Sequence, residues 1–161
     1  MELLNLLIIL FIGGALAWIS EYFSKGLSRW ISLLFITIAA ASLLEMLSNI
    51  PAASFLKDPI TKDPTTWLIH GKLDWIPRFG ISFELALDGL SLILVILTLF
   101  LGAVSVIASW DEIDSHQGFF QANIMWTLTG VIGVFIALDL ILFFLFWEVM
   151  LIPMYLLIAI W

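Results

Sequence analysis

Glu148 is the one charged residue in the most apolar stretch of this chain, which runs from Leu140 to Trp161. About 20 apolar residues in a row are enough for a helix to cross a bilayer. A central acidic charge in such a helix costs roughly 2.5–3.5 kcal/mol on insertion scales. Acidic side chains that are retained at this depth usually line ion or proton pathways, so Glu148 is the leading candidate for chemistry, and that chemistry is proton exchange.

The sequence around Glu148 limits how its carboxyl group can behave. No lysine or arginine follows Arg78, so a cation must come from elsewhere. Without a partner, an apolar environment favours the neutral acid, whereas a nearby cation favours the carboxylate. We therefore expect Glu148 to be a proton relay in a buried channel between helices. Pro153 has no N–H to offer the carbonyl of Val149, so the helix should loosen or bend just beyond the carboxyl group.

Composition excludes several other classes of protein. The chain has 161 residues, of which 63% are hydrophobic and 12% are charged, as expected of an integral membrane protein in contact with the lipid bilayer. It has no cysteine, which excludes disulfides and thiolate metal sites. His70 and His116 are the two possible imidazole ligands, and neither lies in a metal-binding motif. The net charge of −7 argues against nucleic acid as a partner.

Hydropathy predicts an all-α integral membrane fold of about five transmembrane helices with an extramembrane β-hairpin between the second and third. The first helix begins beside Glu2 rather than a basic residue, so we interpret it as a retained span. We divide the chain into residues 1–50 with two helices, 51–87 with the loop and hairpin, and 88–161 with three helices. The predicted helices cover about Leu3–Trp18, Trp30–Leu47, Asp88–Trp110, Gly118–Leu138 and the stretch after Asp139.

Period-two alternation predicts the hairpin. Apolar residues from Trp67 to Trp75 and from Ile81 to Leu87 alternate with polar ones on both sides of the turn at 77–80. Two Lys-Asp-Pro triplets, at 57–59 and 62–64, are typical of a loop. Because an isolated hairpin is only marginally stable, we expect this one to lie on the membrane body or on another subunit.

Small and polar residues indicate where the helices pack and begin. Asp88 is expected to cap the third helix, and Asp139 to mark the turn into the fifth. Small residues at helical spacing predict packing faces at Gly13, Gly14 and Ala17, at Ser91, Thr98, Gly102, Ser105 and Ser109, and at Gly130, Gly133 and Ala137. An aromatic belt is expected at one membrane face, made of Trp18, Tyr22, Trp30 and Trp110. The basic turn with Lys25 and Arg29 favours the cytoplasm, which places the N-terminus and the hairpin in the periplasm.

Each candidate also has a simpler interpretation. Glu148 could be a protonated carboxyl group that is hydrogen-bonded inside a bundle, and Glu45 is expected to reach the membrane interface. His70 and His116 are expected to be solvated. Trp126 and Trp147 are expected to pack, and a further interpretation of Trp147 is that it shapes a cavity beside Glu148.

Several motifs resemble those of one known family. The residues from Phe143 to Tyr155, Phe-Phe-Leu-Phe-Trp-Glu-Val-Met-Leu-Ile-Pro-Met-Tyr, resemble the proton-channel helix of the antiporter-like subunits of respiratory complex I. Trp-Ile-Pro-Arg-Phe-Gly-Ile-Ser at 75–82, Leu-Asp-Gly-Leu-Ser at 87–91 and Gln-Gly-Phe-Phe at 117–120 resemble the same family. The resemblance covers the whole chain.

The resemblance implies that the chain corresponds to the N-terminal part of a larger, fourteen-helix subunit with two inverted five-helix repeats. Residues 88–161 would then include the start of the antiporter-like proton channel repeat. Glu148 matches the family's glutamate, which pairs with a lysine on a later helix beyond the residues present here.

The function implied is that of a membrane subunit of NADH:quinone oxidoreductase, which couples electron transfer to proton translocation in a bacterial inner membrane. Its partners would be other membrane subunits of complex I. NADH, FMN, iron–sulfur clusters and quinone are expected in other subunits, with no cofactor or redox site in this chain. Two alternatives remain: a subunit of a multi-subunit cation/proton antiporter, and a non-transporting fragment with a structural role in a membrane complex.

Overall fold

The computed structural model describes residues 2–24, 26–50, 67–76, 78, 81–113 and 115–161. The predicted loop with its two Lys-Asp-Pro triplets and most of the predicted hairpin turn lie outside these residues. The described elements are, in order, α1 (Glu2–Ser20), α2 (Leu27–Ser48), β1 (Ile69–Ile76), β2 (Ile81–Leu87), α3 (Gly89–Ala108), α4 (Gln117–Ile136) and α5 (Leu140–Ile160).

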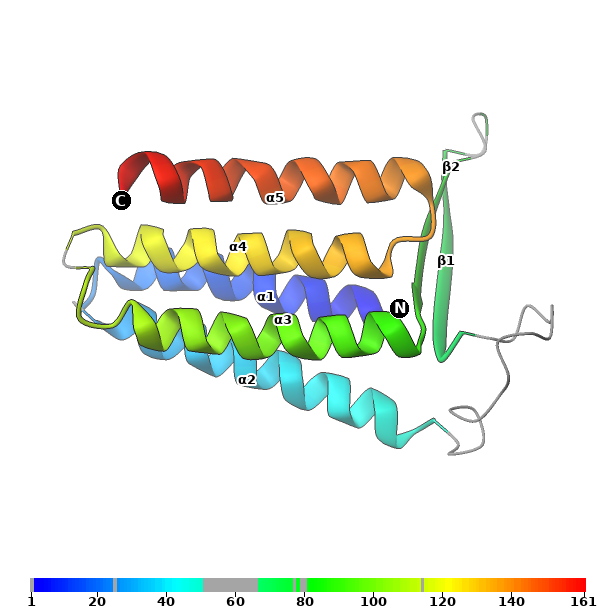
Figure 1. The fold of residues 1–161 in the computed structure, drawn as a ribbon, viewed down its shortest axis with the longest axis horizontal. Coiled ribbons are helices and arrows are strands. Elements are labelled where there is room, and N and C mark those ends of the chain that lie inside the picture. The colour runs from blue at the N-terminus through cyan, green and yellow to red at the C-terminus, as the bar shows by residue number, and fades with distance from the viewer. Residues whose placement is uncertain (1, 25, 51–66, 77, 79–80, 114) are drawn as a thin grey trace.

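The five helices lie side by side, and the hairpin crosses one end of them (Figure 1). All five are long and apolar enough to cross a membrane. The N-terminus lies at the hairpin end, and α4 separates α5 from the other helices (Figure 1). The predicted class, a helical membrane fold with a small two-stranded sheet between the second and third helices, is therefore confirmed.

Small residues on α1 and α4 allow their neighbours to approach closely. A Cβ atom added at Gly13 would lie 2.6 Å from Cβ of Phe35, and one at Gly14 would lie 2.8 Å from Nε1 of Trp126. These predicted packing faces are confirmed. On α3 the prediction is partly wrong, because Thr98, Gly102 and Ser109 are buried but Ser105 is exposed. Ser105 lies at the edge of the buried face, whose centre follows Val95, Gly102 and Val106.

The predicted hairpin is present, but its burial does not alternate as predicted, because Ser82 and Ala86 are buried and Leu73 and Trp75 are exposed. β1 and β2 are antiparallel, with Ile69 opposite Leu87 and Leu73 opposite Phe83. Leu85 and Leu87 are buried in the hydrophobic core that the helices form. A register shift lies between Asp74 and Ile76.

The hairpin is also joined to the turn between α4 and α5. The N–H of Leu138 donates to the carbonyl of Glu84 over 3.0 Å, and Leu85 forms a β-bridge with Ala137. These backbone contacts extend the sheet by a short third segment. The start of α5 is therefore placed relative to the hairpin as well as to α4.

Candidate functional site

Asp139 determines where α5 begins. Its backbone is extended, and Oδ1 accepts hydrogen bonds from the N–H groups of Ile141 at 2.8 Å and Leu142 at 3.3 Å. These donors have no partner within the helix itself. The prediction that Asp139 marks the turn into this helix is confirmed, and α5 then continues through Pro153 as one helix (Figure 1).

The same carboxylate holds the hairpin. Oδ2 of Asp139 accepts a hydrogen bond from the N–H of Ser82 in β2 at 3.3 Å. The N–H groups of Ile141, Ser82 and Leu142 together lower the pKa of Asp139 below its ordinary value, against a smaller opposing effect of burial. One side chain therefore links the first turn of α5 to the sheet.

One face of α5 packs on α4. A Cβ atom at Gly130 would lie 2.7 Å from Cβ of Met150 and 2.9 Å from its backbone nitrogen. Phe146 occupies the space beside Gly133, and Leu142 and Pro153 are buried on the same side of the helix. These contacts set the rotation of α5 about its axis.

Glu148 lies on the other face of α5. Helical spacing places it in a row with Ile141, Phe144, Ile152 and Tyr155, all of which are exposed. Glu148 is exposed too, and among the described residues none donates a hydrogen bond to it or forms an ion pair with it. The expected burial between helices is not seen within these residues, so the relay role stays a prediction.

Trp147 does not enclose Glu148. Its ring is 43% exposed and lies 6.0 Å from the ring of Phe143, measured between centroids. Trp126 has the expected packing role, because its indole N–H donates to the carbonyl of Phe11 at 3.2 Å and its ring lies against those of Phe11 and Trp18.

A second polar group, in α4, was not predicted from the sequence. Gln121 is 2% exposed and Asn123 is fully buried. The amide nitrogen of Asn123 donates to the carbonyl of Phe119 at 2.7 Å, but Oδ1 of Asn123 and Oε1 of Gln121 have no partner among the described residues. Amides do not exchange protons at neutral pH as carboxyl groups do, so these side chains can bind or orient a donor but cannot replace Glu148.

The hairpin carries a cluster of titratable side chains outside the membrane spans. Glu84 accepts from His70 at 2.8 Å and from the hydroxyl of Ser82 at 3.2 Å, and Nζ of Lys72 lies 3.7 Å from it. The hydrogen bond from His70 is the main reason why the pKa of Glu84 is lowered; Lys72 and Ser82 add to it. His70 is therefore paired as well as exposed. The described residues contain no group of three or more His, Cys, Asp or Glu that could hold a metal.

Three other acidic residues lie at the ends of helices. Asp88 caps α3 by accepting from the N–H of Ser91 at 2.7 Å, as predicted. Glu45 is exposed near the end of α2, and its place at the membrane interface stays a prediction. Glu21 accepts from the N–H of Gly118 at 3.2 Å and so caps α4 from a distant part of the chain, which local sequence patterns did not indicate.

Comparisons with known proteins identify relatives of the chain. No family model matches it. It is 51% identical over 97% of its length to the NADH-quinone oxidoreductase subunit M of Pseudomonas aeruginosa, and 47% identical over 97% to that of Escherichia coli strain K12. The chain spans about 30% of the length of these relatives, in agreement with the expectation that it corresponds to part of a larger subunit.

One solved structure has the same fold. It is that of the membrane-bound sulfane sulfur reductase, an archaeal respiratory membrane complex, of which one chain aligns with a TM-score of 0.75 at 24% identity. The alignment covers 100% of this chain and 23% of that one. At this identity the match supports the arrangement of the helices and hairpin.

Proposed function

Because the chain is homologous over almost its whole length to part of the M subunits of NADH-quinone oxidoreductase, we propose that it belongs to the proton-translocating membrane part of such a complex. The observation that carries this proposal is the 51% identity over 97% of the chain. Redox work in other subunits would drive proton transfer here, and this chain would contribute a relay at Glu148 rather than a redox site.

The position of Glu148 supports a role that needs a partner. On the exposed face of α5 its carboxylate would meet lipid, water or another protein segment. Exposure to the centre of the bilayer would cost roughly 2.5–3.5 kcal/mol, and its neighbours Phe144 and Ile152 are apolar and more than 60% exposed. We propose that another protein segment covers this face in the complete subunit and that the lysine implied by the family resemblance comes from it.

In this proposal the described residues hold and position the proton site. In an apolar environment a carboxyl group favours its neutral form, and a nearby cation favours the carboxylate. Asp139 fixes the start of α5, and the close contact between Gly130 and Met150 fixes its rotation. Together they hold Glu148 at a constant depth and direction.

The direct test is Glu148→Ala in the full-length subunit, assembled in its complex and incorporated into vesicles. Proton uptake coupled to NADH oxidation is expected to be abolished, whereas Glu148→Asp, which retains the carboxyl group, should keep part of it. Glu45→Ala is the matched control, because it removes an exposed acid at the end of α2. Normal pumping by Glu148→Ala in an assembled complex would reject the relay.

Co-purification distinguishes the proposal from an antiporter. The subunit should be isolated together with flavin- and iron–sulfur-containing partners. Their absence, together with sodium-dependent proton exchange, would favour a multi-subunit cation/proton antiporter. An intact redox complex without proton flux through this subunit would favour a purely structural role.

We also propose a bacterial inner membrane as the location, with the hairpin on the periplasmic side. The chain contains no cysteine, so single cysteines report topology without background. Arg78→Cys in the hairpin should react with a membrane-impermeant maleimide in intact cells, and Asp111→Cys at the other end should react only after lysis. The reverse pattern would invert the topology.

A further inference from the structure

Arg29 lies at the end of the bundle away from the hairpin, and among the described residues it forms no ion pair. One of its guanidinium nitrogens donates to the carbonyl of Ile113 at 3.1 Å, and its central carbon lies 5.6 Å from the ring centre of Trp110. Among the described residues, ion pairs occur only on the hairpin. A guanidinium group has five N–H donors, and the described residues accept from it at the carbonyl of Ile113.

Two exposed acidic residues belong to the segment that Arg29 contacts. Asp111 and Glu112 fall between the two points that Arg29 contacts, and both are exposed. Neither forms an ion pair with a described residue. The end of the bundle therefore presents a positive and a negative region next to each other, which suits a headgroup that carries both charges.

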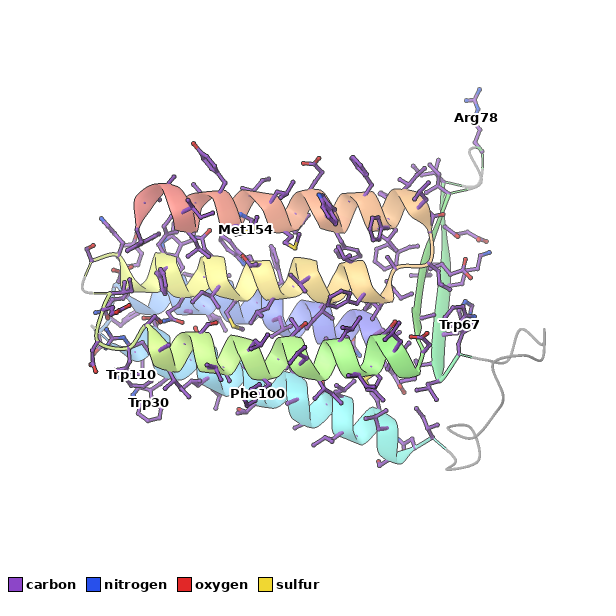
Figure 2. All side chains as sticks on the ribbon, viewed as in Figure 1. Trp30, Trp67, Arg78, Phe100, Trp110 and Met154 are labelled. Carbon is purple, nitrogen blue, oxygen red and sulfur yellow. The ribbon has the colours of Figure 1, made fainter. Side chains whose placement is uncertain are left out.

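Two tryptophans mark this end as a membrane interface. Trp30 is 63% exposed, and its ring meets that of Trp110 edge to face at 5.3 Å. Figure 2 shows the two together at one end of α2 and α3, with Phe100 further along α3. Tryptophan is enriched at the level of lipid headgroups, so Arg29 lies where a phosphate would be.

An apolar groove lies deeper between the same two helices. It has a volume of about 310 Å³, and α2 and α3 diverge along it (Figure 1). Its walls include Ile36, Ala40 and Leu43 of α2 and Ile96, Leu99 and Ala103 of α3. The hydroxyl of Thr37, which also lines it, is satisfied by the carbonyl of Leu34.

The groove and Trp30 share the same face of α2. Seven-residue spacing places Thr37 and Leu44 below Trp30 on α2. On α3, Ala103 and Ile96 have the same spacing, and Trp110 follows two residues after the end of this helix. At 1.5 Å per residue, the groove begins about 10 Å below Arg29 and ends about 22 Å below it. A leaflet is about 15 Å deep, so an acyl chain that starts at the headgroup level reaches the groove.

The size of the groove limits its occupant. A helix with its side chains is about 10–12 Å across, wider than one hydrocarbon chain, and the groove of about 310 Å³ lies between two helices that touch each other. A hydrocarbon chain is one methylene wide and needs no polar partner. From these observations we propose that α2 and α3 bind a phospholipid, with its phosphate on Arg29, an ammonium headgroup beside Asp111 and Glu112, and one acyl chain in the groove.

The test uses the full-length subunit in vesicles that contain a phosphatidylethanolamine probe with a photoreactive group in its acyl chain. Peptide mapping should find the label on the groove-lining residues of α2 and α3. Arg29→Gln should reduce this labelling about fivefold, in line with the contribution of one basic side chain at a membrane surface, and Arg29→Lys should restore most of it. Arg78→Gln is the matched control, because Figure 2 shows Arg78 at the opposite end; it should change nothing.

A second variant tests the groove separately. Ala103→Phe should fill the groove and abolish labelling there while the headgroup site stays intact. Unlabelled phosphatidylethanolamine should compete better than phosphatidylglycerol, which lacks the ammonium group. Label spread evenly over all exposed helix faces, equal labelling of Arg29→Gln and the unsubstituted protein, or crosslinks from the groove to another protein helix would each overturn the proposal.

Discussion

The fourth and fifth helices show opposite relations between apolar character and burial. α4 has the lowest mean hydropathy of the five described spans, yet 61% of its most apolar 18-residue stretch is buried. α5 is more apolar, and only 17% of the corresponding stretch of α5 is buried. α4 contacts α1, α2, α3 and α5, whereas α5 contacts α4 and β2. The polar side chains of α4 are therefore covered within these residues, and the carboxylate of α5 is not.

This difference separates two tasks. Met125 and Ile132 of α4 are fully buried in a core to which α1 to α4 contribute most of the residues and α5 contributes Leu142 and Phe146. α5 is attached along one face and at its first turn, and the row that contains Glu148 is left open. The bundle thus positions the helix with the candidate proton site, and the environment of that site depends on what covers the open face of the helix.

The largest effect is expected where the two helices meet. Gly130→Ala places a Cβ atom against the backbone of Met150 as well as its side chain, and a backbone cannot change rotamer to make room. α5 must move away, at a cost of about 1–3 kcal/mol. Thermal unfolding of the full-length subunit in detergent should show a lower Tm, and proton translocation should fall with it.

The control is Gly89→Ala, since no atom lies within 4 Å of a Cβ at that glycine. Gly102→Ala is intermediate, because the atoms it meets are the ends of the flexible Leu128 side chain. Equal Tm values for the Gly130 and Gly89 variants would show that α5 is not held by close contact with α4.

Gln121→Met probes the polar side chain on the buried helix. Oε1 of Gln121 is buried without a partner among the described residues, and an unsatisfied buried acceptor costs about 1–3 kcal/mol. Methionine has a similar length and no strong acceptor, so the Tm of the subunit should rise or stay unchanged. A fall in Tm would instead reveal a donor, such as a bound water molecule, that Gln121 needs.

Asp139→Ala probes the attachment of α5 at its first turn. The change removes three hydrogen bonds, two within α5 and one to Ser82, and should cost about 1–2 kcal/mol. Hydrogen exchange should accelerate both at the start of α5 and in β2. Asp88→Ala, which removes the cap of α3, should accelerate exchange in α3 alone; acceleration confined to α5 in the Asp139 variant would disprove the link to the hairpin.

The sequence was sufficient for what depends on local pattern. The five spans, the hairpin and the caps at Asp88 and Asp139 all follow from residue order within one element. The small residues at Gly13 and Gly130 indicated packing faces because only small side chains allow such close approach.

Long-range contacts could not be predicted from the sequence. Glu21 caps α4 from 97 residues away, and Arg29 contacts Ile113 from 84 residues away, and no local pattern encodes such pairs. The environment of Glu148 could not be predicted from the sequence either, because apolar neighbours along one helix do not determine which other helix covers them. That is why the place of Glu148 along α5 was predictable and its burial was not.

The smallest expected effect is the response of the hairpin to pH. The pKa of Glu84 lies below its ordinary 4.5 and that of Asp139 below its ordinary 3.8. Their ionised forms therefore stabilise the fold fully above these ordinary values, and the stabilisation is lost as the pH falls through the lowered pKa values. Amide exchange in β2, corrected for the intrinsic effect of acid, should accelerate below about pH 4. Exposed ion pairs contribute little, so the change in exchange rate should be modest. Glu84→Gln should remove the part of this change that is due to His70 and Lys72.

Because Asp139 also caps α5, the part of the pH response that is due to Asp139 should extend to the first turn of that helix. A pH response in β2 that leaves exchange at the amides of Ile141 and Leu142 unchanged would show that Asp139 does not link the hairpin to the helix that carries Glu148.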